Sequence, residues 1–170
     1  MDNGVNPYMG VQGYRAGTRN PTWRELVGEV AFQLDRRILA SVFPDHERLY
    51  GYTVNNIPER IMALALEAAP GSPSERRSLG AVQRYLSVMR RLQSRGYRRS
   101  VHPALSEALV NTCGVLASPG GRGLNLNLSP GCLRRALAET LPGAALADAL
   151  VLLECLEEMA REDGHPLFCW

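Results

Sequence analysis

The apolar pattern of residues 22–43 constrains the fold of this chain more than any other feature. Thr22 and Glu25 have the T-x-x-E spacing of a capping box, which marks the start of a helix. The pattern stops at Phe43-Pro44, because a residue before proline disfavours helical backbone geometry. Between these limits, apolar residues recur at steps of three and four, the period of one helix face. The segment predicts a long amphipathic helix with a buried stripe: Trp23, Leu26, Val27, Val30, Ala31, Leu34, Ile38 and Val42.

Three charged residues of this segment, Glu29, Arg36 and Arg37, lie off the apolar stripe. We expect Arg36 and Arg37 to be exposed, or to be paired with Asp35 or with acidic residues of the segment 139–163. Either arrangement leaves the apolar stripe free to form the core.

Proline and glycine divide the rest of the chain into further helical segments. Pro58 and Pro73 suit the first turn of a helix, and Gly96 suits a left-handed helix end. Helices are expected at 57–69, 73–95, 103–113, 129–141 and 142–163. The sequence therefore predicts an all-α fold, an irregular bundle of about six helices over residues 22–170. Residues 1–21 are expected to form a flexible leader, because they are rich in glycine and have no periodicity.

The distribution of apolar residues also predicts which helices are central. Segment 57–69 is apolar on nearly every face, so we expect it in the middle of the bundle. Together with 22–43 and 142–163 it should build the core. Segment 73–95 should bury one stripe, and residues 45–56 should be a loop with one short extended piece. The stripe expected in 73–95 consists of Leu79, Val82, Leu86 and Met89, with Tyr85 and Leu92 beside it.

The basic residues are all arginine, 19 in number, and the chain contains no lysine. This excludes a phosphate-binding P-loop lysine and a Schiff-base lysine. The glycine-rich stretch 117–128 is therefore interpreted as a linker. The histidines (His46, His102 and His165) lie in no recognised catalytic motif. We expect no enzyme activity and no cofactor.

The cysteines are Cys113, Cys132, Cys155 and Cys169, and none of them forms a C-x-x-C pair. Their spacings fit no zinc module, so no metal site is expected. The N-terminus does not resemble a signal peptide, and no window of ~18 apolar residues could span a membrane. These features favour free thiols and a cytoplasmic location.

Arginine is concentrated between residues 76 and 99, whereas residues 139–163 are mainly acidic. One reading is a solvated helix face, partly paired with the acidic helix. The functional alternatives are a surface for an acidic protein partner, or an anion-binding face for nucleic acid or phospholipid. The arginines that share one helical face are Arg77, Arg84, Arg91, Arg95 and Arg98.

The last residues, 166–170, place Phe168 and Trp170 close to the end of the sequence given. These aromatic side chains either fold back onto the core or form an apolar docking element for a partner. We therefore include Phe168 and Trp170, with the arginine face, in the candidate partner surface.

Three stretches of the chain resemble the C-terminal domain of the speriolin family. They are 27–61 (VGEVAFQLDRRILASVFPDHERLYGYTVNNIPERI), 96–116 (GYRRSVHPALSEALVNTCGVL) and 166–170 (PLFCW). The resemblance implies a non-enzymatic scaffold protein of male germ cells, associated with the centrosome, centriole or sperm neck. It also implies the anaphase-promoting-complex activator Cdc20 as a candidate partner. Family members carry a long region with a coiled coil before this domain, whereas only some twenty residues precede it here.

Overall fold

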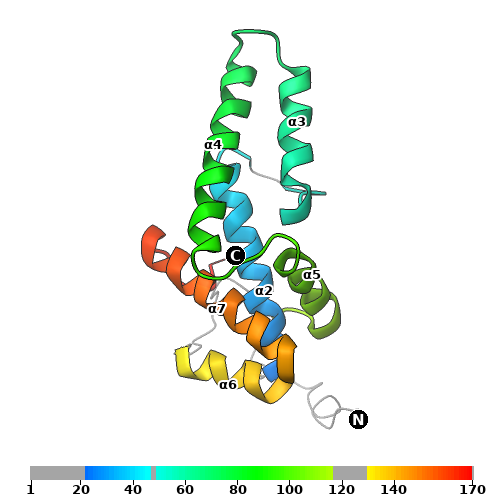
Figure 1. Ribbon diagram of the computed structural model, residues 1–170, viewed down its shortest axis with the longest axis vertical. Helices are drawn as coiled ribbons and strands as arrows, with labels where there is room; N and C mark the ends of the chain where they lie inside the picture. The colour runs from blue at the N-terminus through cyan, green and yellow to red at the C-terminus, as the bar shows by residue number, and fades with distance from the viewer. Residues whose placement is uncertain (1–21, 47–48, 117–129, 170) are drawn as a thin grey trace.

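The computed structural model describes residues 22–46, 49–116 and 130–169, which form helices without strands (Figure 1). The predicted leader at 1–21 and the linker at 117–128 lie outside the described residues. The all-α prediction is confirmed. The elements are α2 (Trp23–Val42), the 3-10 turn η2 (Val54–Asn56), α3 (Ile57–Glu67), α4 (Pro73–Gln93), α5 (His102–Cys113), α6 (Pro130–Thr140) and α7 (Gly143–Asp163).

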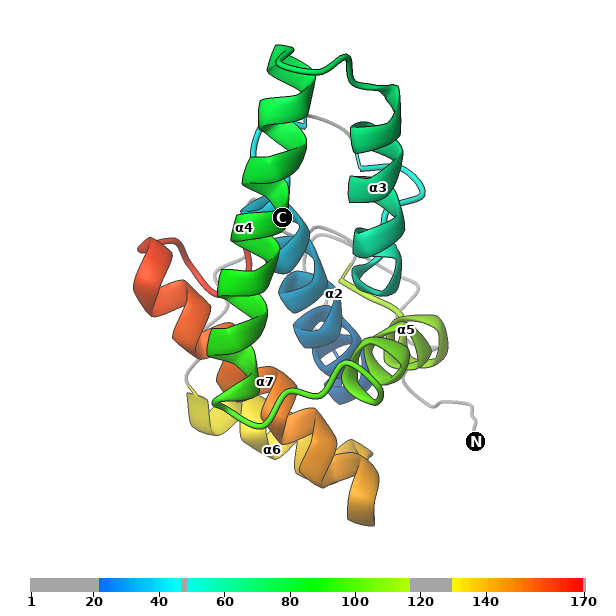
Figure 2. The same ribbon diagram turned by 45° about the horizontal axis from the view of Figure 1, so that its top comes forward.

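Helix α2 is the central element, and α4, α5, α6 and α7 all pack against it (Figure 2). Its start is fixed by the predicted capping box. The Glu25 N–H donates to Thr22 Oγ1 at 3.1 Å, and the Thr22 N–H donates to Glu25 Oε1 at 3.0 Å. Leu34 and Ile38 in the middle of the stripe have no exposed surface, as predicted.

Helix α3 is peripheral, so its predicted central position is wrong. It forms a hairpin with α4 that projects from the rest of the molecule (Figures 1 and 2). Ile57 and Ile61 face the core, whereas Met62 is 62% exposed and Leu66 is 80% exposed. An apolar residue on every face did not indicate burial here, because only one side of α3 meets another helix.

Helix α4 is rotated relative to the prediction. Leu79, Val82 and Leu86 are exposed, and of the predicted stripe only Met89 is buried. The face that packs on the body includes Ala81, Val88 and Met89, together with Tyr85 and Leu92, which were predicted beside the stripe. Helix α4 therefore has two apolar faces, of which the core uses one.

The chain between α2 and α3 contains turns and η2 instead of the expected extended piece, over the residues that are described. Thr53 and Asn56 form a reciprocal cap around η2, with bonds of 2.8 and 3.2 Å. Such a local side-chain cap competes with extended backbone.

Candidate interaction surface

Three of the predicted arginines form ion pairs that join α4 and the following loop to α7. Arg91 Nη1 lies 2.5 Å from Glu162 Oε1, and Arg95 Nη2 lies 2.8 Å from Glu158 Oε1. Arg98 Nη2 lies 3.3 Å from Asp148 Oδ1. The reading of a face partly paired with the acidic helix therefore describes these three residues. All three arginine side chains remain substantially exposed, so solvent screens each pair and it contributes little to stability.

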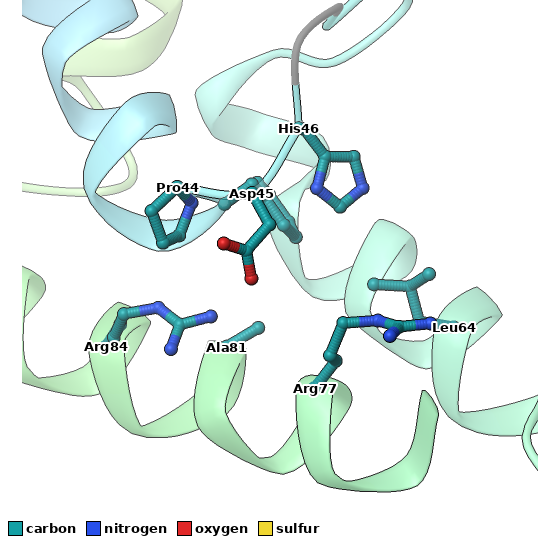
Figure 3. Close-up of a pocket in the computed structure, with 8 residues that line it drawn as sticks. Pro44, Asp45, His46, Leu64, Arg77, Ala81 and Arg84 are labelled. Atoms are coloured by element: carbon teal, nitrogen blue, oxygen red, sulfur yellow. The ribbon is translucent and has the colours of Figure 1, made fainter. Parts of the chain in front are cut away.

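Arg77 and Arg84 lie on the part of α4 that faces the end of α2 (Figure 3). Arg84 Nε donates to the Val42 carbonyl at 3.0 Å, and Arg77 Nη2 donates to Ser74 Oγ at 3.0 Å. Both border a hollow of about 20 Å³, which has room for about one water molecule. Figure 3 shows the Asp45 carboxylate between the two arginines, which counters their attraction for an anion.

The described part of the tail folds back along α2. Phe168 is 5% exposed and belongs to the core cluster, as the first of the two tail alternatives anticipated. The Cys169 N–H donates to Gln33 Oε1 at 3.0 Å. Trp170 lies outside the described residues. Phe168, a member of the candidate partner surface, is therefore part of the core in this conformation.

Arg37 holds the tail in place. Its guanidinium donates to the Asp163 carboxylate and to the backbone carbonyls of His165, Pro166 and Leu167, at 2.8 to 3.1 Å. Arg37 is 1% exposed, and the Asp163 carboxylate balances its buried charge. Of the two predicted arrangements, pairing with the acidic segment is confirmed.

Arg37 is the last of three buried polar residues at successive turns of α2. Gln33 Nε2 donates to Glu29 Oε2, and Glu29 Oε1 accepts the Leu116 N–H at 2.9 Å. Burial raises the Glu29 pKa, although the bonds from Gln33 and from the Leu116 N–H oppose this shift. Sequence reasoning missed this polar row, although the i, i+4, i+8 spacing of Glu29, Gln33 and Arg37 was a visible signal.

A second buried polar cluster lies between α2 and α5. The His102 ring stacks on Tyr97 at 5.2 Å between centroids, and His102 Nδ1 accepts the Arg98 N–H at 2.7 Å. Burial lowers the His102 pKa, although Asp148 opposes this shift. Desolvation raises the Asp35 pKa to about 8, although Ser106 opposes it. Burial thus favours the neutral forms of Asp35 and His102, and His102 is the first residue of α5.

The largest apolar exposure in the described residues lies on the α3–α4 hairpin. We call Met62, Leu66, Leu79, Val82 and Leu86 the hairpin stripe. Met62, Leu66, Leu79 and Leu86 are each more than half exposed, and Val82 is 37% exposed. Neighbouring exposed apolar side chains, such as Leu79, Val82 and Leu86 along α4, are typical of interaction sites. The sequence pattern predicts burial for the α4 members, so their exposure corrects that prediction.

The described residues form neither a metal-binding cluster nor a membrane-spanning helix. No group of three or more His, Cys, Asp or Glu side chains lies close enough to hold a metal ion. None of the described helices has the length and apolar character that crossing a bilayer requires.

Fold and contacts together define an all-helical domain whose parts are joined by a buried arginine and by ion pairs between helices. The family model described as Speriolin C-terminus matches residues 26–170, so the chain belongs to the speriolin C-terminal family. This confirms the resemblance seen in the sequence.

Two relatives show how much of the family's length this chain represents. The chain is 49% identical to Speriolin of Homo sapiens over 155 residues, which are 87% of this chain and 25% of that protein. It is 46% identical to Speriolin of Mus musculus over 160 residues, which are 90% of this chain and 32% of that protein. The chain thus spans a quarter to a third of these relatives. No solved structure matches it.

Proposed function

We propose that this chain is a non-enzymatic protein-interaction domain that acts as a scaffold at the centrosome, centriole or sperm neck of male germ cells. The speriolin family supports the cellular setting, and Cdc20 is one candidate partner. The observation that carries the molecular part is the exposed hairpin stripe. Helix α4 of the hairpin packs on the core through one face and exposes apolar side chains on another, so it can bind a protein without losing its own core contacts.

The ion pairs of α4 and its following loop favour this proposal over the anion-binding alternative. Arg91, Arg95 and Arg98 direct their charge at carboxylates of α7. A nucleic acid or phospholipid would have to compete with those carboxylates. A protein partner on the hairpin stripe would leave the ion pairs intact.

The test is affinity capture with the tagged chain from testis extract, with imaging of the same chain in male germ cells. We expect enrichment of centrosomal or sperm-neck proteins and a focus at that structure. An Arg91→Ala and Arg95→Ala double variant serves as a control and should capture the same proteins. A diffuse signal with no such enrichment would refute the proposed function. Steeply salt-dependent binding to duplex DNA or anionic vesicles would support the anion-binding alternative instead.

A further inference from the structure

The α4 members of the hairpin stripe, Leu79, Val82 and Leu86, are exposed on a face of α4 that the core does not use. Leu79, Val82 and Leu86 occupy positions i, i+3 and i+7 of α4, and Met62 and Leu66 occupy i and i+4 of α3. Each set therefore lies on one side of its own helix. The core uses a different face of α4, so the stripe can be covered without moving any buried residue.

Two arginines mark the ends of the stripe on α4. Arg76, Leu79, Gln83, Leu86 and Arg90 follow one another at steps of three and four, so they lie in one row along the helix. Arg76 to Arg90 is a separation of ~21 Å, about four helical turns. The row thus has a cation at each end, with Leu79 and Leu86 on either side of the polar Gln83 between them.

These two arginines differ from those that brace α4 against α7. Arg76 Nη1 donates to the Gly71 carbonyl at 3.3 Å, and both Arg76 and Arg90 are exposed. Neither forms an ion pair with a carboxylate of the described residues, in contrast to Arg91 and Arg95. The hairpin therefore has cationic charge available for an external carboxylate.

We propose that the α4 part of the hairpin stripe, Leu79, Val82 and Leu86, binds an amphipathic helix of a partner protein, with an apolar face and acidic residues toward both ends. This inference rests on the proposed function and names the chemistry of the partner. Apolar residues of the partner at i, i+3, i+4 and i+7 contact Leu79, Val82 and Leu86, and its carboxylates pair with Arg76 and Arg90. A second copy of this chain is the weaker fit, because α4 packed on α4 would bring arginines of like charge together.

The direct test uses two synthetic helical peptides of about 18 residues with the same leucine pattern. One peptide carries glutamates on its flanks and the other carries lysines. We expect the glutamate peptide to bind the labelled chain at least ~10-fold more tightly in fluorescence anisotropy. A Leu79→Glu and Leu86→Glu double variant should weaken this binding at least ~10-fold. Equal binding of both peptides would overturn the proposal.

Matched variants separate the stripe from the rest of α4. Ser87→Glu places the same new charge on an exposed position outside the row and should change the affinity less than ~2-fold. Arg76→Ala with Arg90→Ala should weaken binding several-fold and flatten its salt dependence. Circular dichroism should show that all variants remain folded, because every substituted side chain is exposed or partly exposed. Equal loss with Ser87→Glu and with the leucine double variant would contradict the assigned site.

Two further readouts distinguish the other outcomes. A wild-type dimer in sedimentation that the leucine double variant abolishes would assign the stripe to a second copy and overturn the proposal. Germ-cell capture that persists in the double variant would also overturn it, while leaving the proposed function standing on another face. Peptide binding with no capture by the wild-type chain would contradict the proposed function alone.

Discussion

Arg37 of α2 and Asp163 at the end of α7 form a forked ion pair between residues 126 positions apart. Arg37 Nε lies 2.8 Å from Asp163 Oδ2, and Arg37 Nη2 lies 3.0 Å from Asp163 Oδ1. Arg37 is almost completely buried, whereas Asp163 keeps 34% of its side chain exposed. Because the same guanidinium also bonds three tail carbonyls, one side chain of the central helix fixes the end of α7 and the tail.

Arg37→Ala should lower the free energy of unfolding by about 2–4 kcal/mol. The tail carbonyls would lose their donor, and the packing of a large buried side chain would be lost. Arg36→Ala is the matched control, because Arg36 is partly exposed, and it should change stability by less than ~0.5 kcal/mol. Urea unfolding followed by circular dichroism measures both values. A similar effect of the two substitutions would contradict the role assigned to Arg37.

Asp163 should make the domain sensitive to acid. Burial alone would raise its pKa, but the bonds from Arg37 and from the His165 N–H hold the pKa below its usual value. A lowered pKa means stability that is complete above the unfolded-state pKa of about 3.9 and is lost as the pH falls through the folded-state value. Asp163→Asn should remove this part of the acid dependence in urea unfolding between about pH 2 and pH 6. An unchanged profile would show that the pair contributes no proton-linked stability.

Asp35 should have the opposite effect. Its pKa is raised to about 8 because desolvation disfavours the carboxylate, with Ser106 opposing and Glu107 adding to the shift. The folded state then holds the proton more strongly, so stability falls as the pH rises from about 4 to about 8. The stability of the Asp35→Asn variant relative to the wild type should therefore increase with pH across this range, by at most ~1.4 kcal/mol per pH unit. Asp35 is partly exposed, so this increase in relative stability should be smaller than the limit. A constant difference between the two proteins over this range would contradict the shift.

Gly28→Ala should destabilise the domain by at least ~2 kcal/mol. A methyl group on Gly28 would overlap the carbonyl oxygen of Gly114. Gly114 follows the end of α5 and has a φ of +77°. Gly131→Ala in α6 is the control, because nothing lies near the added carbon there. It should be neutral or up to ~1 kcal/mol more stable, since alanine favours a helix over glycine. Thermal unfolding of the two variants measures the contrast, and equal midpoints would contradict the close approach.

Local signals in the sequence predicted the helix boundaries, and long-range packing decided the rest. The capping box at Thr22 and Glu25 depends on neighbouring residues only, so it could be predicted. The orientation of α4 could not, because its two apolar faces have the same period and only its contacts with α2 and α3 select between them. In the same way, the sequence pattern was compatible with an exposed or a paired Arg37. The position of Asp163 and of the tail determines that Arg37 is paired.

Of the candidate surface, the sequence indicated the arginines of α4 but could not show which of them have partners. Arg91 and Arg95 pair with α7 because α7 lies beside that end of α4, a relationship with no local signature. The α4 leucines of the hairpin stripe were predicted to lie in the core for the same reason. Apolar residues recur with the same period whether their helix face meets another helix or the solvent.

The hairpin stripe should therefore contribute to binding and little to stability. Leu34→Ala, at a position with no exposed surface, should lower the free energy of unfolding by about 2–5 kcal/mol, because it leaves a cavity in the core. Leu66→Ala removes the same atoms from a residue that is 80% exposed, so it should change stability by less than ~0.5 kcal/mol. Urea unfolding of both variants compares the two sites with identical chemistry. A large loss at Leu66 would mean that the stripe is already covered in the protein as it exists in solution, by a second copy or by another part of the chain.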